Sequence, residues 1–140
     1  MFREGLRPPD PFRERPPLER LLTQDGMSLD ALSRLGPLLV VCLPDRGERG
    51  LLAEVAAHRG AIERSGVRLA LVHPAEAPPE LPEALRYVAR VADPALGLYA
   101  FLGLGRTKGT LFRREGQASG LFLLRDGAVV RAVASPADLA

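Results

Sequence analysis

The residues Pro37–Pro44, PLLVVCLP in one-letter code, decide the fold of this chain. Six apolar residues stand between two prolines, which is the pattern of a strand buried on both faces. A second run of the same kind spans Val67–Val72. Between them, residues 48–65 carry apolar side chains at helical spacing and are followed by Gly66, which is typical of an amphipathic helix with a glycine stop. The order strand, helix, strand predicts a parallel βαβ unit at the centre of a sheet.

The length and composition of the chain fit one soluble domain preceded by an arm. The 140 residues, 46% of them apolar, suffice for one core and are too few for two ordinary domains. Residues 1–17 hold five prolines among alternating charges, so we expect an arm there and a single domain over residues 18–140. No apolar run approaches the roughly 20 residues that span a bilayer, and no apolar signal segment stands at the N-terminus. We therefore expect a cytoplasmic protein with no membrane partner.

Charge and cysteine usage exclude several kinds of site. The net charge is +2, but the 19 basic residues are scattered among 17 acidic ones, so no basic stripe for nucleic acid is present. Arginine occurs 18 times and lysine once, which favours a GC-rich, heat-adapted source. The single cysteine, Cys42, excludes a disulfide within the chain and gives no metal-ligand spacing with His58 and His73. No metal and no cofactor are expected.

Short elements are expected on the N-terminal side of the first buried strand. Residues 18–23 are interpreted as a short strand, and Gln24-Asp25-Gly26 has the chemistry of a turn. Ser28 is expected to cap a short helix that continues to Leu35. Gly36, followed by proline, ends this helix just before the buried strand.

The pattern becomes more irregular after the βαβ unit. Residues 82–89 are expected to form a helical segment. Asp93, followed by Pro94, is expected to cap a helix over residues 95–102. Residues 103–119 are rich in glycine and charge without a clear period, and they are interpreted as a loop.

A β-hairpin is expected close to the C-terminus. Apolar runs at residues 121–124 and 128–133 flank Arg125-Asp126-Gly127, and Asp-Gly between two apolar runs is a strong hairpin signal. The hairpin adds an antiparallel pair to the parallel strands. The fold class is therefore α/β, with a mixed sheet flanked by helices.

This order of elements resembles a thioredoxin-like fold, and several short strings are similar to the AhpC/TSA peroxiredoxin-like family. The resemblance covers about residues 18–134. It implies a peroxiredoxin-like mixed sheet. The strings are Thr23-Gln24-Asp25-Gly26 with Ser28-Leu29, Gly36 to Val41, Gly66-Val67, Asp93-Pro94 with Leu98-Tyr99 and Gly103-Leu104, and Gly120 to Leu124 with Asp126-Gly127.

The resemblance also shows where the reactive cysteine of the family is missing. One branch of the family carries Pro-x-x-x-Thr-x-x-Cys-Thr-x-Glu after the first long strand. Placed on Pro44, this motif puts Glu48 at the threonine, Leu51 at the reactive cysteine and Glu54 at the glutamate. The Gly-Cys-x-x-Cys motif of another branch falls on residues 47–51 and again puts Leu51 at a cysteine. A leucine can neither attack a peroxide nor form a mixed disulfide.

A second departure from the family agrees with the first. Many peroxiredoxins carry an arginine just before the Gly-Leu-Phe of the later strand, where it stabilises the thiolate, and Ser119 occupies that position here. The cis-proline that thioredoxins place before this strand is also missing, since no proline occurs from Ala95 to Val133. We therefore expect a non-catalytic binding or assembly module.

The alternative is a thiol-dependent antioxidant protein of peroxiredoxin type that uses Cys42 with an external thiol as resolving partner. Cys42 lies inside the first buried strand between Val41 and Leu43. We expect it to be a buried, inert thiol with a raised pKa, whereas the alternative requires an accessible thiol of low pKa.

Two charged segments are the remaining candidates for ligand binding. Asp45, Arg46, Glu48 and Arg49 surround the loop that hosts catalysis in the family. A solvated loop is the simpler interpretation, and a small polar ligand at the helix N-terminus is the alternative.

The second segment is glycine-rich. Arg106 and Lys108 lie within residues 103–110, which suggest an anion site, but the spacing fits neither a P-loop nor a dinucleotide motif.

Structural roles are expected for the histidines and for two aromatic residues. His58 shares the helical face of Leu51, which predicts a place at the rim of the core, and His73 ends the second buried strand. Tyr99 and Phe101 are expected to make core contacts.

The sequence identifies no particular substrate or protein partner. The resemblance implies a homo-oligomer formed through sheet edges or through loops beside the site. The apolar pair Leu51-Leu52 is expected to suit such a contact.

Overall fold

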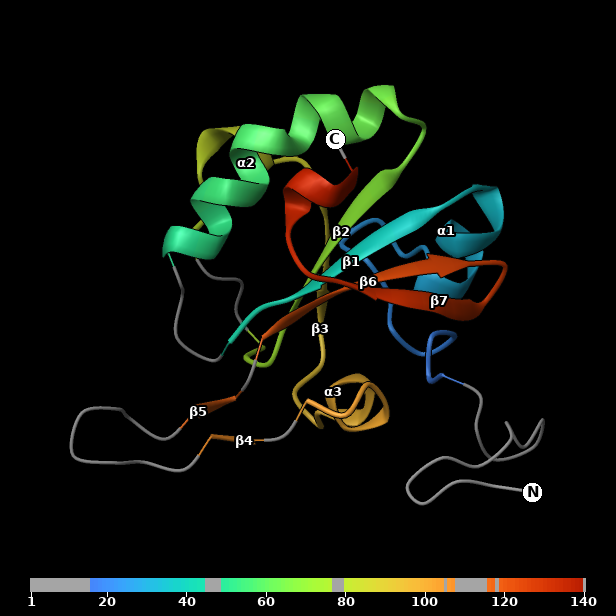
Figure 1. Ribbon diagram of the computed structural model, residues 1–140. Coiled ribbons are helices and arrows are strands. Elements are labelled where there is room, and N and C mark those ends of the chain that lie inside the picture. Colours follow the sequence, from blue (N-terminus) through green and yellow to red (C-terminus); the bar gives the residue numbers. More distant parts are fainter. Residues whose placement is uncertain are drawn as a thin grey trace, which may run out of the picture.

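A five-stranded mixed sheet forms the centre of the protein in a computed structural model (Figure 1). The structure describes residues 16–44, 49–76, 80–104, 106–107, 116–117 and 119–139, so the expected arm lies outside them apart from Pro16 and Pro17. The sheet order is β3-β2-β1-β6-β7, with β1, β2 and β3 parallel and the β6–β7 hairpin antiparallel. The strands are β1 (Leu38–Cys42), β2 (Arg68–His73), β3 (Ala89–Ala92), β6 (Gly120–Arg125) and β7 (Ala128–Val133). The expected mixed α/β sheet is confirmed.

The predicted βαβ unit is present and includes the central strand. Every residue of β1 is buried, and β1 pairs in parallel with β2 from Leu38 opposite Arg68 onward. The connecting helix α2 (Arg49–Arg64) ends before Gly66, whose φ of 87° is the conformation that glycine adopts most readily. The apolar stripe that predicted α2 is the face that packs on the sheet.

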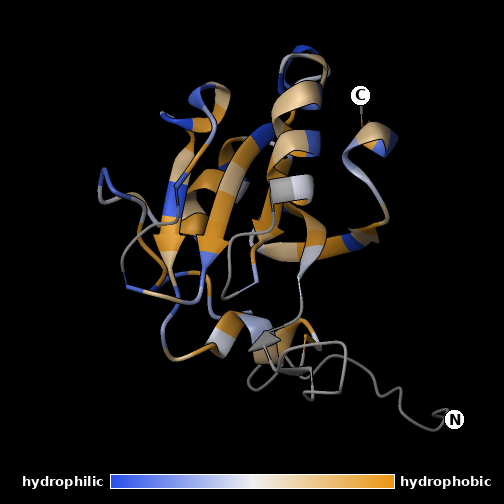
Figure 2. Ribbon diagram, turned by 90° about the vertical axis from the view of Figure 1, so that its left-hand side faces the viewer, coloured by the Kyte–Doolittle hydropathy of each residue, from blue (hydrophilic) through white to orange (hydrophobic). Residues whose placement is uncertain are grey.

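Helices cover both faces of the sheet. On one face, α2 packs beside the C-terminal 3-10 helix η2 (Pro136–Leu139) (Figure 1). On the other face, α1 (Leu29–Leu35) and α3 (Gly97–Phe101) bury Leu29, Leu98 and Tyr99. Figure 2 shows the apolar strands between these layers. Burying each large apolar side chain contributes about 1.5–3 kcal/mol.

The β6–β7 hairpin has the turn that its sequence predicts. Asp126 and Gly127 have φ values of 52° and 78°, which matches a type I′ turn. The turn docks on α1 at Ser33, whose carbonyl accepts the Asp126 N–H at 2.8 Å and whose Oγ accepts the Gly127 N–H at 2.8 Å. Ser28 caps α1 as predicted, because its Oγ accepts the Ala31 N–H at 3.0 Å.

Both edges of the sheet carry features that oppose the addition of another strand. At the β3 edge, the Gln24 side chain donates from Nε2 to the Val88 carbonyl at 3.0 Å and accepts the Arg90 N–H at Oε1 at 2.7 Å. At the β7 edge, the register shifts so that pairing skips Val130, and Arg131 is exposed. Irregular pairing and charge on an edge strand disfavour strand addition.

Two expected elements differ from the structure, and one strand was not expected. Residues 18–23 form no strand and make only isolated bridges through Leu22 and Thr23. The helix expected over residues 82–89 is reduced to the 3-10 turn η1 (Glu83–Leu85), and β3 follows it. A run of only four residues gave too weak a signal for this strand, which pairs with β2.

The region after β3 also departs from expectation. The helix begins at Gly97 instead of residue 95, because Leu96 adopts a left-handed conformation with φ of 60°. Asp93 still caps it, since its carboxylate accepts the N–H groups of Gly97 and Leu98 at 3.2 and 2.9 Å. Within the expected loop 103–119, the described residues form a short antiparallel pair, β4 (Arg106–Thr107) and β5 (Gly116–Gln117).

Candidate functional site

The two positions at which this chain differs from the family that it resembles line the same pocket. Leu51 lies in the first turn of α2, and Ser119 directly precedes β6. They meet because β1 pairs antiparallel with β6, which sets Cys42 at the end of β1 opposite Gly120 at the start of β6. The pocket has a volume of about 460 Å³. Its other lining residues are Gly50, Glu54, Gly120, Leu121, Val133 and Ala134.

The described side chains of this pocket are aliphatic apart from the Ser119 hydroxyl and the Glu54 carboxylate. Leu51 is partly buried against the core on the α2 side, and Ser119 offers an exposed hydroxyl without charge. A side chain at Gly120 would bring a Cβ within 2.8 Å of the Phe122 ring, so the backbone itself forms this wall. Among the described residues that line the pocket, none is a thiol or a cation.

The only thiol of the chain lies in the sheet. Cys42 is fully buried in β1. Burial and, to a smaller extent, the charge of Asp93 raise the pKa of its thiol to about 12. Because the thiolate is the nucleophile, such a thiol is inert at neutral pH. The expected buried cysteine with a raised pKa is confirmed.

The sequence of this chain matches no family model and no curated protein, whereas its fold matches solved structures. One of them is the bacterioferritin comigratory protein of Xanthomonas campestris, a protein with alkyl peroxide reduction activity. Its TM-score is 0.58 at 16% sequence identity, and the match covers 81% of this chain and 78% of that one. The reduced Prx3 of Vibrio vulnificus gives 0.62 at 14% identity over 84% and 82%. The fold is that of the peroxiredoxins. At these identities the likeness concerns the fold alone.

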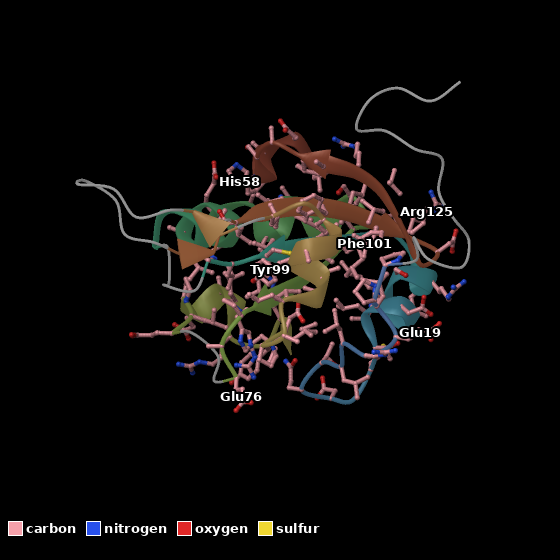
Figure 3. The ribbon with its side chains drawn as sticks, turned by 90° about the horizontal axis from the view of Figure 1, so that it is seen from below. Glu19, His58, Glu76, Tyr99, Phe101 and Arg125 are labelled. Carbon is pink, nitrogen blue, oxygen red and sulfur yellow. The ribbon has the colours of Figure 1, made fainter. Side chains whose placement is uncertain are left out.

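In this peroxiredoxin fold, a buried tyrosine connects the carboxyl ends of two parallel strands. Tyr99 on α3 is fully buried, and its hydroxyl contacts the carbonyls of Leu43 and Val72 at 2.6 and 3.0 Å. Figure 3 labels Tyr99 on α3, seen from below. The sequence predicted a core contact for Tyr99 but carried no signal of this hydrogen bond. The same expectation was wrong for Phe101, which is 36% exposed.

Both histidines lie where the sequence predicted. His58 is half-buried on α2, and its Nδ1 lies 2.9 Å from the Glu54 carbonyl. His73 is buried at the end of β2, with Nδ1 2.6 Å from the Ala75 carbonyl. Burial lowers the pKa of His73, and Arg90 lowers it further, while the hydrogen bond to Ala75 acts in the opposite direction.

Most of the charged ligand candidates cannot be placed beside the pocket. Asp45, Arg46, Glu48 and Lys108 lie outside the described residues. Arg49 begins α2 and Arg106 belongs to β4, but the structure describes only the backbone of these two.

Two further expectations concern metals and membranes. In the part of the chain that the structure describes, no three His, Cys, Asp or Glu side chains gather in a way that could hold a metal ion. None of the helices there has the length and apolar character needed to span a bilayer.

The apolar contact expected from Leu51-Leu52 needs correction, because Leu52 is only 3% exposed and belongs to the core.

Proposed function

We propose that this chain is a non-catalytic binding or assembly module on the peroxiredoxin fold, related to the AhpC/TSA peroxiredoxins. The observation that supports the proposal is the pocket shared by Leu51 and Ser119. By resemblance, these positions hold the reactive cysteine and its arginine in the family. The pocket therefore lies where the family has its reactive site, but its chemistry differs. An aliphatic side chain stands in place of the thiolate, and a hydroxyl stands in place of the cation.

The partner in this proposal is another protein, and a second copy of the chain is the form we expect first. A pocket of about 460 Å³ is large enough for one or two side chains of a partner. The sheet edges at Gln24 and Val130 disfavour strand addition, so we expect the two copies to meet at the pocket and not by edge-to-edge pairing. Light scattering tests this part: Leu51→Arg is expected to convert a dimer to a monomer, and a wild-type protein that stays monomeric at high concentration removes the idea of self-assembly.

The alternative function, thiol-dependent peroxide reduction through Cys42, requires an opening of the sheet. Cys42 has no exposed surface, and its raised pKa keeps the side chain in the thiol form at neutral pH. A peroxide would therefore react only with the small fraction of molecules in which β1 is locally unfolded.

One experiment separates the two functions. Alkylation of native Cys42 is followed by intact mass across the pH range, and peroxide consumption with a thiol reductant is measured in the same samples. The proposal predicts labelling that depends on denaturant and a rate of peroxide loss that is equal for wild type and Cys42→Ser. Fast labelling with a midpoint below about pH 7.5, or peroxide loss that Cys42→Ser abolishes, overturns the proposal.

A cytoplasmic location is part of the proposal and rests on the expectation from the sequence. Fractionation of cells that express the full chain tests it. Recovery of the protein outside the cytoplasm would refute this part without touching the pocket.

A further inference from the structure

A second and larger pocket lies at the opposite end of the sheet. Its lining includes Leu38, Arg68 and Ala89, which are the first residues of the parallel strands β1, β2 and β3. The Leu51 pocket lies beyond the last residue of β1, so the two pockets are separated by the length of the strands. The volume of about 530 Å³ falls in the range of small-molecule sites. The proposed function does not use this pocket.

The pocket has an apolar floor, and two exposed large side chains stand among its other lining residues. Leu38, Leu69 and Val88 form part of the floor and are buried in the two core clusters. The exposed side chains are those of Tyr87, which is 82% exposed, and Leu35 on α1, which is 58% exposed. Large apolar side chains that gather around a cavity in this way mark a binding surface more often than scattered ones.

Four charged side chains line the same pocket, and two of them are already paired. On α2, the Nε of Arg59 donates to Glu63 at 3.2 Å, and its Nη1 donates to the Ala84 carbonyl. This guanidinium is therefore fixed and neutralised by its own surroundings. Asp25 and Arg68 are the other two charges.

Asp25 and Arg68 have opposite charges and no partner for their side chains among the described residues. Asp25 belongs to the turn that leads into α1. Side chains alternate along a strand, so Arg68 shares its face with Ala70, which packs in the cluster on the α1 side. One carboxylate and one guanidinium thus border a cavity with an apolar floor, and no ion pair joins them. An occupant complementary to this pattern carries an ammonium group, a carboxylate and an apolar body.

We propose that this pocket binds an apolar α-amino acid, whose ammonium group contacts Asp25, whose carboxylate contacts Arg68 and whose side chain packs against Tyr87 and Leu35. Guanidinium and carboxylate form strong, charge-assisted hydrogen bonds. The flat ring of Tyr87 offers apolar contact at low entropic cost. Each element of the ligand therefore has a matching side chain in the pocket.

Calorimetric titration of the full chain with L-phenylalanine tests the proposal. Phenylalanine is expected to bind once per chain, whereas 3-phenylpropionate, which lacks the ammonium group, and phenethylamine, which lacks the carboxylate, bind about tenfold more weakly or worse. Glycine, which lacks the apolar body, is expected to show no binding. No saturable heat with phenylalanine or leucine overturns the proposal, as does equal affinity for the analogues with one charge.

Matched variants locate the binding. Arg68→Gln and Asp25→Asn are expected to weaken phenylalanine binding about tenfold, while Arg64→Gln, an exposed arginine of α2 outside the pocket, leaves it unchanged. Tyr87→Ala is compared with Phe101→Ala in the same way. Equal effects within either pair would refute the site. Leu51→Arg at the other pocket leaves binding intact, so this test succeeds or fails independently of the proposed function.

Discussion

Replacing Tyr99 by phenylalanine removes a single oxygen atom from the interior and leaves the ring in place. Two carbonyls lose a donor, but their losses differ. The Val72 carbonyl still accepts the Leu43 N–H at 2.8 Å, whereas the donor to the Leu43 carbonyl is the Tyr99 hydroxyl. One buried acceptor is left without a partner, which costs about 1–3 kcal/mol of unfolding free energy.

Urea denaturation followed by circular dichroism measures this cost, and the midpoint is expected to fall while the slope stays unchanged. In a thermal scan the same loss corresponds to roughly 3 °C per kcal/mol for a chain of this size. Tyr87→Phe is the matched control, because that residue is 82% exposed and its hydroxyl remains hydrated in the folded protein. A Tyr99→Phe loss below about 0.5 kcal/mol, or no larger than that of the control, would refute the reasoning.

Three further predictions concern other parts of the fold. Burial lowers the pKa of His73 in the folded protein, so its contribution to stability is complete above the pKa of the unfolded chain, near 6.5, and is lost as the pH falls. The urea midpoint should therefore decrease from about pH 7 to about pH 5, and His73→Asn should make this decrease smaller. Gly127→Ala should lower the free energy of unfolding by about 1–2 kcal/mol, since φ is 78° and the new Cβ would lie 2.7 Å from the Arg34 guanidinium. Gly97→Ala is the control in the same denaturation assay and should be neutral, because open space surrounds that position. Gln24→Ala leaves the Val88 carbonyl and the Arg90 N–H open at the β3 edge, and dynamic light scattering should show increased self-association; a variant as monodisperse as the wild type would contradict the role of Gln24.

The central unit could be predicted because its signals are local. The buried run of β1 and the helical stripe of α2 each lie within one segment, and Asp126-Gly127 specifies its own turn. The strand β3 could not be predicted in this way. It depends on pairing with β2 and on Gln24, whose two hydrogen bonds join residues 64 and 66 positions apart. Such long-range pairing overrides weak local preference.

The candidate site shows the same division. Leu51 and Ser119 could be singled out only through the resemblance, because their meeting depends on the pairing of Cys42 with Gly120 across the sheet. The pocket at the other end had no signal in the sequence. Its walls come from segments between Asp25 and Ala89, and no local pattern reports which strand ends lie side by side.

The two edges of the sheet, which disfavour strand addition, restrict the ways in which a partner could contact this protein. Addition of a partner strand is disfavoured at Gln24 and at the irregular pairing near Val130. In the proposed function, recognition therefore rests on a few side chains at the two ends of the strands, where the cavities lie. Substitutions at those positions can change the occupant while the strands and their pairing stay as they are. Under the proposed function, a change of specificity therefore does not require a change in strand pairing.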